Sequence, residues 1–474
     1  MKLTALCPVF VVVLLTTPAV GQWEPARRLT FHDSTGYLSN STQFPIAAVG
    51  DTLHLVWWDY KTGNGDLYYI RSFDNGTTWE PERCIVNDPF WQGYPSLLAI
   101  GDTLHLVWTD ERNMSGRLRE SDIYYMRSTD GGTTWGEQTR LTFATTGELG
   151  AYFPVMVASG CTLHLVFHDD RAGLAGDDNV FYRRSLDGGR TWGQELAIGI
   201  NTGDWCPTIA VSGRFVHVAW ENYWQERVTY RRSTNGGKDW LPEYEFPTPD
   251  KADSPCIAAE GQNVHLAYVD GRDNFSQFYY FRSTNNGATW APERQISNDQ
   301  AHTWSVNLWA SGQYLHAVRM DMIMYVTHYT RSTDRGLTWE PDFVVSCESA
   351  IHTHHYHVIT SRNTVHVVHD GYPLGGHIYN QEIYHRRNTS GNVGMFDIAH
   401  LSPATPKPLV VPSVFRTHGV LPGREQGLVS VFDPAGNRVA VQRGDQIGKG
   451  LGAGVYLVCP VDSTSPACRV VKLE

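Results

Sequence analysis

The chain has 474 residues, of which 41% are hydrophobic and 18% are charged, and Asp and Glu outnumber Lys and Arg by 49 to 38. This length suits one large repeat domain with a small companion domain better than a single ordinary domain. The acidic balance provides no basic field that would attract a phosphate backbone, so we expect no nucleic-acid partner.

The first 21 residues predict a secretory signal peptide. Lys2 precedes an apolar run from Cys7 to Leu15, and small residues follow up to Gly21. The apolar run is too short to span a bilayer, and no later segment reaches that length. We therefore expect an extracellular protein, secreted or held at the cell surface, without a membrane span.

A ten-residue segment recurs six times along the chain, and we call it the box. In each box, the Ser and Asp (or Asn) side chains suit a tight hairpin, the Gly allows positive φ, and the Trp suits packing between sheets. A residue type that is repeated in every unit cannot mark one unique catalytic site, so we interpret the box as a folding device. The copies are RSFDNGTTWE from Arg71, RSTDGGTTWG from Arg127, RSLDGGRTWG from Arg184, RSTNGGKDWL from Arg232, RSTNNGATWA from Arg282 and RSTDRGLTWE from Arg331.

Each box belongs to a larger unit of four short strands. A first apolar strand, often opened by proline, leads through a glycine turn into an alternating strand, and the third and fourth strands flank the box. Such a unit, repeating at roughly fifty residues, is the sequence pattern of a β-propeller blade. We therefore predict an all-β fold with a seven-bladed propeller, and a six-bladed ring is the alternative. The alternating strand starts at Leu53, Leu104, Leu163, Val216, Val264, Leu315 and Val365.

The seventh unit lacks a complete box and the usual fourth strand. The missing sequence has its counterpart at the other end of the mature chain, where WEPARRLTF begins at Trp23. We predict that this N-terminal segment supplies the outermost strand of the last blade, which closes the ring and removes its free edges.

The boxes resemble the Asp-box, or BNR repeat, of the sialidase superfamily. This resemblance covers about residues 23 to 397 and implies an extracellular propeller of a kind that often handles carbohydrate. Asp-boxes occur in sialidases, other glycoside hydrolases, sorting receptors and non-catalytic binding propellers, so the resemblance does not select one activity. The pattern S-x-D-x-G-x-T-W starts at Ser72, Ser128, Ser185 and Ser332, and Asn replaces the Asp at Asn235 and Asn285.

The composition changes after the propeller, which we assign to residues 22–398. Residues 399–412 form a proline-rich linker that we expect to be extended. Residues 413–474 contain alternating strands such as VSVFDPAGNRVA and predict a small Ig-like β-sandwich. This tail resembles the C-terminal sorting domains of bacterial surface and type IX secreted proteins, which implies contact with a secretion machinery or anchoring. A stabilising module is the alternative.

The loops after the alternating strands and the connections between blades are predicted to share one face, where a propeller would carry its function. Three of these loops hold an Asp-x-Arg element. Arginines from several blades would bind a carboxylate in bidentate fashion, as sialidases require, whereas salt bridges between blades are the structural alternative. An early Arg-Ile-Pro motif of the sialidase kind is absent. The elements are Asp110 with Arg112, Asp169 with Arg171, and Asp270 with Arg272.

Carboxylates and tryptophans complete the predicted site. Glu221 joins Asp110 and Asp169 as carboxylates that would serve a two-carboxylate glycosidase mechanism if they faced one another across the ring. Flat aromatic rings near the first strands or in the loops would stack on sugar faces, and core packing is the alternative. These rings belong to Trp91, Trp205, Trp224 and Trp304.

Histidines and cysteines suggest no cofactor. The seventh unit contains IHTHHYHV, in which His355 and His357 would share one side of a strand, but every alternating strand also carries a histidine, which favours a structural role. We therefore predict no bound metal. Without Cys7 the cysteines form an odd set, in which we expect Cys459 and Cys468 to pair and the others to be buried thiols.

Three functional hypotheses remain. The leading one is a monomeric, secreted or surface-held propeller that binds glycan or another extracellular polymer through its loops. The second is a glycoside hydrolase of exo-sialidase type that uses the Asp-x-Arg arginines and the loop carboxylates. The third is a surface adhesin whose partner is a protein.

Overall fold

The computed structural model describes residues 23–31, 35–38, 44–114, 120–143, 150–170, 179–199, 201, 203–248, 251–273, 275–346, 350–373 and 380–392, and five strands nearer the C-terminus. The chain divides into two units, residues 1–392 and 393–474. In the described segments every regular element is a β-strand. Accordingly, none of them contains a helix that is long and apolar enough to cross a membrane.

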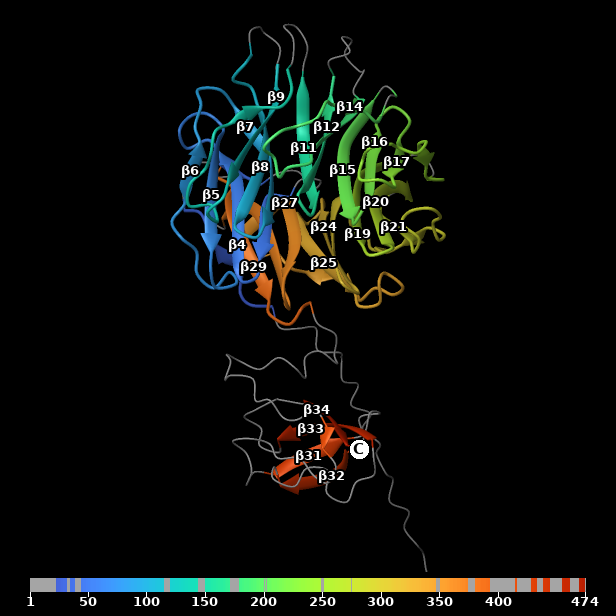
Figure 1. The fold of residues 1–474 in the computed structure, drawn as a ribbon. Coiled ribbons are helices and arrows are strands. Elements are labelled where there is room, and N and C mark those ends of the chain that lie inside the picture. The colour runs from blue at the N-terminus through green and yellow to red at the C-terminus, as the bar shows by residue number, and fades with distance from the viewer. Residues whose placement is uncertain are drawn as a thin grey trace, which may run out of the picture. The chain divides into compact units, whose positions relative to one another are not determined.

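Seven antiparallel sheets form the first unit, and Figure 1 shows them arranged as the blades of a propeller. The prediction of seven blades is confirmed, and the six-bladed alternative is excluded. The first blade contains β2 (Gly36–Tyr37), β3 (Ile46–Val49), β4 (Thr52–Asp59), β5 (Asp66–Ser72) and β6 (Arg83–Val86). The second contains β7 (Gln92–Ile100), β8 (Thr103–Asp110), β9 (Asp122–Ser128) and β10 (Thr139–Arg140). The third contains β11 (Ala151–Ser159), β12 (Thr162–Asp169), β13 (Asn179–Ser185) and β14 (Leu196–Ala197).

The remaining blades follow the same order. The fourth contains β15 (Asp204–Ser212), β16 (Phe215–Asn222), β17 (Arg227–Ser233) and β18 (Tyr244–Glu245). The fifth contains β19 (Ala252–Glu260), β20 (Asn263–Asp273), β21 (Phe275–Ser283) and β22 (Arg294–Gln295). The sixth contains β23 (Thr303–Ser311), β24 (Tyr314–Asp321), β25 (Val326–Ser332) and β26 (Phe343–Val344). The seventh contains β27 (Ala350–Ser361), β28 (Thr364–Pro373), β29 (Glu382–Asn388) and, from the other end of the chain, β1 (Arg27–Arg28).

The two faces of the ring have different contents. The start of an inner strand pairs with the end of the strand that follows, as Trp205 of β15 does with Glu221 of β16. Inner-strand starts, second-strand ends and connections between blades therefore share one face, which we call the loop face and which matches the prediction. The start of the second strand pairs with the first residues of the box, as Leu53 does with Ser72, so the boxes lie on the opposite face, the box face. Inner strands of six blades surround an apolar central channel of about 290 Å³.

The boxes fold as predicted and also join neighbouring blades. In the first box, Ser72 Oγ accepts a hydrogen bond from Gly76 N at 2.9 Å, and Asp74 Oδ1 accepts one from Thr78 N at 2.7 Å. The box Trp packs edge-on against a ring of the preceding blade, as Trp135 does against Tyr69 with 5.6 Å between ring centroids, and in the first box Trp79 meets His385 instead of a tyrosine. The repeated sequence is thus explained by folding within a blade and by adhesion between blades.

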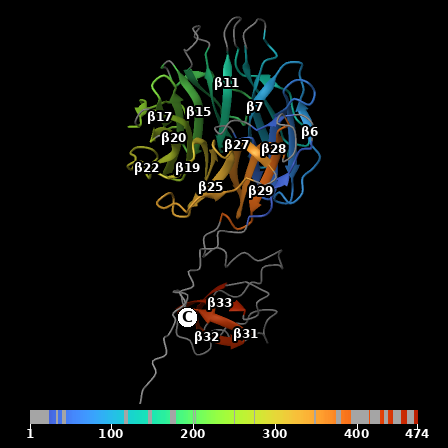
Figure 2. The same cartoon turned by 180° about the vertical axis from the view of Figure 1, so that it is seen from behind.

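The N-terminal segment closes the ring, as predicted. Strand β1 pairs with β29, with Arg28 opposite Tyr384, and in Figure 2 the orange last blade lies beside the blue first blade. Trp23 packs edge-on against Tyr329 of the sixth blade at 4.9 Å, which is the contact that the box Trp makes elsewhere. An ion pair of 2.7 Å between Arg387 and Glu24 adds to the closure.

In the second unit, four strands form an antiparallel sheet, and a fifth strand pairs in parallel with its edge. The Ig-like sandwich and its sorting role stay predictions, and the expected Cys459–Cys468 pair lies outside the described residues. In the first unit, Cys84 and Cys161 are exposed, so the prediction of buried thiols is wrong for both, because each lies near the end of a strand rather than within the core. The five strands of the second unit are β30 (Val414–Phe415), β31 (Leu428–Phe432), β32 (Arg438–Arg443), β33 (Gly454–Pro460) and β34 (Arg469–Leu473).

Candidate functional site

A cavity of about 410 Å³ opens on the loop face between the fourth, fifth and sixth blades. Its walls include the starts of the inner strands β15, β19 and β23 and the end of β16. Three residues selected from the sequence, Trp205, Glu221 and Trp304, meet in this cavity. Tyr223, Asp253 and Ser254 also line it.

Bulges at the starts of the inner strands position these side chains. The register of β19 against β20 shifts between Asp253 and Cys256, and similar shifts interrupt β15 and β23. A bulge turns the side chains near it away from strict alternation. At Ser254, where φ is 49°, the backbone N–H donates a hydrogen bond of 2.7 Å to Glu221 Oε2. Glu221 of the fourth blade is thereby fixed against the fifth.

Two carboxyl groups in the cavity have strongly raised pKa values. Burial raises the pKa of Glu221 to about 7, against the hydrogen bond from Ser254, and the charge of Asp253 raises it further. Burial also raises the pKa of Asp253 to about 7, and the charges of Asp270 and Glu226 contribute. The Asp253 side chain is exposed to the cavity whereas Glu221 is only partly exposed, so water screens Asp253 more and the raised pKa is better supported for Glu221. A carboxyl group whose pKa is raised toward neutral suits proton transfer, and Glu221 is the stronger candidate of the two.

Aromatic rings surround the carboxyl groups and continue beyond them. Trp304 is 54% exposed. Trp205 is half-buried and stacks on His168 with 4.3 Å between ring centroids. From Trp205 the row continues through Phe153, at 5.6 Å, to Tyr94, a further 4.3 Å away. Phe153 is buried, so this aromatic row reaches the loop face at Trp205 and at the half-buried Tyr94.

The other two predicted tryptophans have different surroundings. Trp91 packs against the core of the first two blades and contacts Tyr94 edge-on at 5.3 Å, so it contacts the aromatic row from the core side. Trp224 is 63% exposed in the loop between β16 and β17, next to Tyr223 in the cavity wall.

In both described Asp-x-Arg elements, the arginine forms an ion pair with the aspartate of the same element. Arg112 forms a 2.6 Å ion pair with the buried Asp110, and its guanidinium lies over the ring of Tyr124 at 4.4 Å. Arg272 pairs with Asp270 at 2.7 Å and with Glu293 at 2.7 Å. Both arginines thus pair with carboxylates of their own blade, and Arg112 Nε also lies 3.8 Å from Oδ2 of Asp88, in the connection from the first blade.

Neither described arginine lines the cavity between the fourth, fifth and sixth blades. Asp169 is buried at the end of β12, and Arg171 lies outside the described residues. The multi-blade carboxylate clamp therefore stays a prediction. A buried Asp or Asn at or near the end of the second strand is common to the blades, which indicates a structural role: Asp59, Asp110, Asp169, Asn222, Asp270, Asp321 and Asp370.

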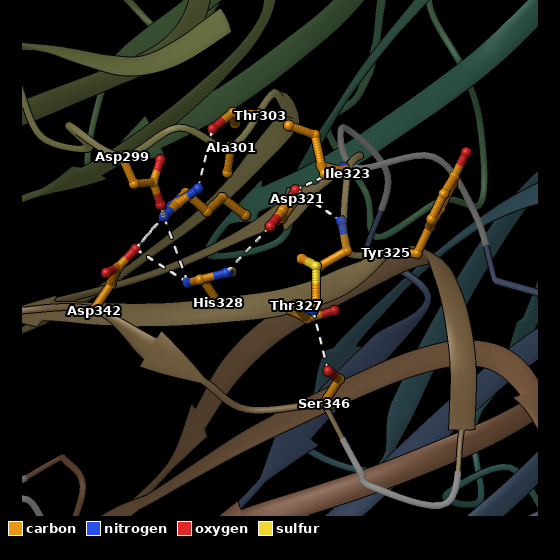
Figure 3. A network of polar contacts seen from close by, with 12 residues as sticks. Asp299, Ala301, Thr303, Asp321, Ile323, Tyr325, Thr327, His328, Asp342 and Ser346 are labelled. Atoms are coloured by element: carbon orange, nitrogen blue, oxygen red, sulfur yellow. Dashed lines mark hydrogen bonds and ion pairs between the residues drawn. The ribbon is translucent and has the colours of Figure 1, made fainter. Parts of the chain in front are cut away.

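Figure 3 shows a polar network in the sixth blade, where Arg319 of β24 lies opposite His328 of β25 at positions that hold Trp108 and Tyr124 in the second blade. Ligand-type atoms of Asp299, His328 and Asp342 lie within 4.8 Å of one another, as metal ligands would. However, the buried Arg319 forms ion pairs with both aspartates, and its Nε lies 2.9 Å from Asp342 Oδ2. The guanidinium already supplies the positive charge, so we interpret this cluster as structural.

The histidine-rich strand is also interrupted by bulges. Register shifts flank Thr353, which breaks the alternation that would have placed His355 beside His357. His357 is buried, whereas His355 Nδ1 lies 2.7 Å from Oδ2 of the buried Asp370. The side chain of His352 lies outside the described residues. An orienting carboxylate thus accompanies His355, which sequence spacing did not reveal.

Asp253 and Ser254 were not predicted from the sequence as residues of the site. Asp253 occupies the place in the repeat that Tyr152, Trp205 and Trp304 hold in other blades, one residue before the bulged position. A carboxylate at a position that is aromatic in three other blades is the signal that would have identified it.

Comparisons with known proteins agree with the repeat. A model described as a BNR repeat-like domain matches residues 92–270, and a BNR repeat-containing family member matches residues 19–145. No curated protein matches.

Several solved structures are similar. An alpha-L-arabinofuranosidase of Fusarium graminearum, solved with an iminosugar inhibitor, is 16% identical over 75% of this chain and 97% of its own, with a TM-score of 0.44. Polysaccharide lyase Uly1 is 10% identical over 77% and 99%, with a TM-score of 0.47. A Hadza microbial sialidase is 17% identical over 60% of this chain and 63% of its own, with a TM-score of 0.42. At these identities the likeness concerns the fold alone.

Proposed function

We propose that the propeller binds an extracellular glycan at the cavity between its fourth, fifth and sixth blades. One observation carries the proposal: Trp205 and Trp304 line the same cavity of about 410 Å³ as two carboxyl groups. Aromatic faces stack on the C–H faces of sugars, and carboxyl groups hydrogen-bond to sugar hydroxyls. The volume lies within the range of small-ligand sites, about 300–1,000 Å³.

The aromatic row supports a polymer rather than a single sugar as the ligand. Tyr94, which is half-buried, adds a second aromatic surface beyond Trp205, and the buried Phe153 packs between the two rings. Further sugar units would contact this row while one unit occupies the cavity. An extracellular location, which the N-terminal sequence predicts, would bring such polymers within reach.

A glycan array followed by isothermal titration with the best oligosaccharide tests this proposal. Trp304→Ala should weaken binding about 10-fold, because it removes one stacking surface. Phe73→Ala is the matched control, since Phe73 is 58% exposed but lies in a box. Absence of binding on the array, or equal losses in both variants, would contradict the proposal, and silence on the array would favour a protein-binding adhesin.

Glycoside hydrolysis is the second candidate function, and the Glu221–Asp253 pair favours it. A protonated carboxyl would give its proton to the glycosidic oxygen as the bond to the anomeric carbon breaks. The ionised partner would take a proton from the water that forms the new bond to that carbon. The pair thus accounts for both protons and needs no cofactor.

Turnover of fluorogenic glycosides, sialosides included, tests this candidate. Glu221→Gln and Asp253→Asn should each reduce kcat by at least about 100-fold, with an activity maximum near pH 7 in the parent protein. If turnover instead depends on Arg112, with both carboxyl variants fully active, the sialidase-type clamp would replace this mechanism.

A further inference from the structure

We infer that the cavity between the fourth, fifth and sixth blades selects a positively charged sugar unit, of the amino-sugar class, over an acidic one. This inference rests on the proposed glycan binding and adds the charge of the ligand. Among the described residues that line the cavity, two are carboxylic acids and none is lysine, arginine or histidine.

In the described part of the chain, no lysine or arginine is among the charges that act on Glu221 and Asp253. Asp270 and Glu226 add negative charge around Asp253. Arg272, near the end of β20, forms ion pairs with Asp270 and Glu293. Lys251 is exposed, and the middle of its side chain lies along Gly271. A cationic ligand would therefore supply the charge that the protein leaves out.

The aromatic walls favour the same ligand. Trp205, Tyr223 and Trp304 line the cavity with the two carboxyl groups. An ammonium group is attracted to the face of an aromatic ring and to a carboxylate, and both attractions strengthen where water is excluded. An acidic sugar would instead place a third negative charge beside the pair and lose the hydration of its own carboxylate.

The charge of the ligand has a consequence for pH dependence. A bound cation stabilises the ionised forms of Glu221 and Asp253, whose pKa values are about 7 in the free protein. Binding therefore releases protons below that pH, and affinity for a cation rises as the pH passes through about 7. A neutral sugar has no charge to couple to this ionisation, so its affinity should change much less.

Isothermal titration with three oligosaccharides of equal length tests the inference. The probes are N,N,N-trimethylglucosamine, which keeps its charge at every pH, neutral N-acetylglucosamine, and acidic galacturonate. At pH 8.5 the cationic probe should bind about 10-fold more tightly than the neutral one, and the acidic probe should bind most weakly. At pH 5.5 the preference for the cationic probe should shrink by at least about 3-fold.

Variants of the two carboxyl groups test whether these groups cause the preference for the cationic probe. Glu221→Gln and Asp253→Asn should each reduce the ratio of cationic to neutral affinity, whereas Asp102→Asn, which removes an exposed charge on the box face, should leave it unchanged. Neutral or acidic probes that bind as tightly as the cationic one, or a ratio that no carboxyl variant alters, would overturn the inference while leaving glycan binding intact. Absence of binding by any oligosaccharide would overturn the proposed function itself.

Discussion

Replacement of Gly237 by alanine tests whether the boxes hold neighbouring blades together. Gly237 lies in the box of the fourth blade with φ of 73°, and a Cβ there would overlap the hydroxyl of Tyr182 in the third blade. That hydroxyl is hydrogen-bonded to His164 Nδ1 at 2.7 Å, and the Tyr182 ring packs edge-on against Trp240 at 4.9 Å. The methyl group must therefore displace a ring that has partners in both blades.

The neighbouring Gly236 is a matched control within the same box. Its φ is 69°, but a Cβ there would meet nothing within 4 Å. Gly236→Ala should cost only the left-handed conformation, about 1 kcal/mol. Gly237→Ala should cost about 3–5 kcal/mol in total, because the overpacking and the loss of the Tyr182 hydrogen bond add to the same conformational cost.

Calorimetric melting of the purified protein measures the difference. The midpoint of Gly237→Ala should fall well below that of Gly236→Ala. In a double-mutant cycle, Tyr182→Phe should offset part of the loss in Gly237→Ala, since it removes the overlapping oxygen, with a coupling of about 1–2 kcal/mol. Equal midpoints for the two alanine variants, or no coupling to Tyr182, would refute the role assigned to the boxes.

Three further outcomes are expected from the same structure. Glu221→Gln should raise the free energy of unfolding by about 1–2 kcal/mol at pH 8 but not at pH 4. The pKa of Glu221 is about 7 in the folded protein, above the ordinary 4.5, so its ionisation destabilises the fold increasingly as the pH rises from 4.5 to 7. Arg319→Met should destabilise the protein by about 3–5 kcal/mol in denaturant unfolding, because Asp299 and Asp342 lose their common cation; an unchanged midpoint would contradict this. Deletion of residues 23–31 should expose β29 as a free edge and speed its limited proteolysis, whereas an unchanged cleavage pattern would contradict the closure.

Much of the fold was accessible from the sequence because the repeat imposes it. Each blade must bury its faces against neighbours, so the same strand pattern recurs from Leu53 to Val365, and the incomplete seventh unit requires the N-terminal segment that begins at Trp23. The assignment of loops and boxes to opposite faces was predictable for the same reason, because successive strands of an antiparallel blade end at opposite faces.

The site was only partly accessible because it is formed between blades. Trp205, Glu221 and Trp304 were chosen one by one, and the sequence carried no information that bulged strands would bring them together. Ser254 N donates a hydrogen bond to Glu221 across a blade boundary, and the charge of Asp253 acts on Glu221 across the same boundary. The spacing of Asp110 and Arg112 fits both a pair within one loop and a clamp between blades, and only the coordinates distinguish them.

Hydrogen–deuterium exchange, measured with and without a bound oligosaccharide, tests most directly where the propeller recognises glycan. The account predicts new protection at the starts of β15, β19 and β23, around Trp205, Ser254 and Trp304, with no change in the boxes. Protection confined to the box face, with these three strand starts unchanged, would contradict it.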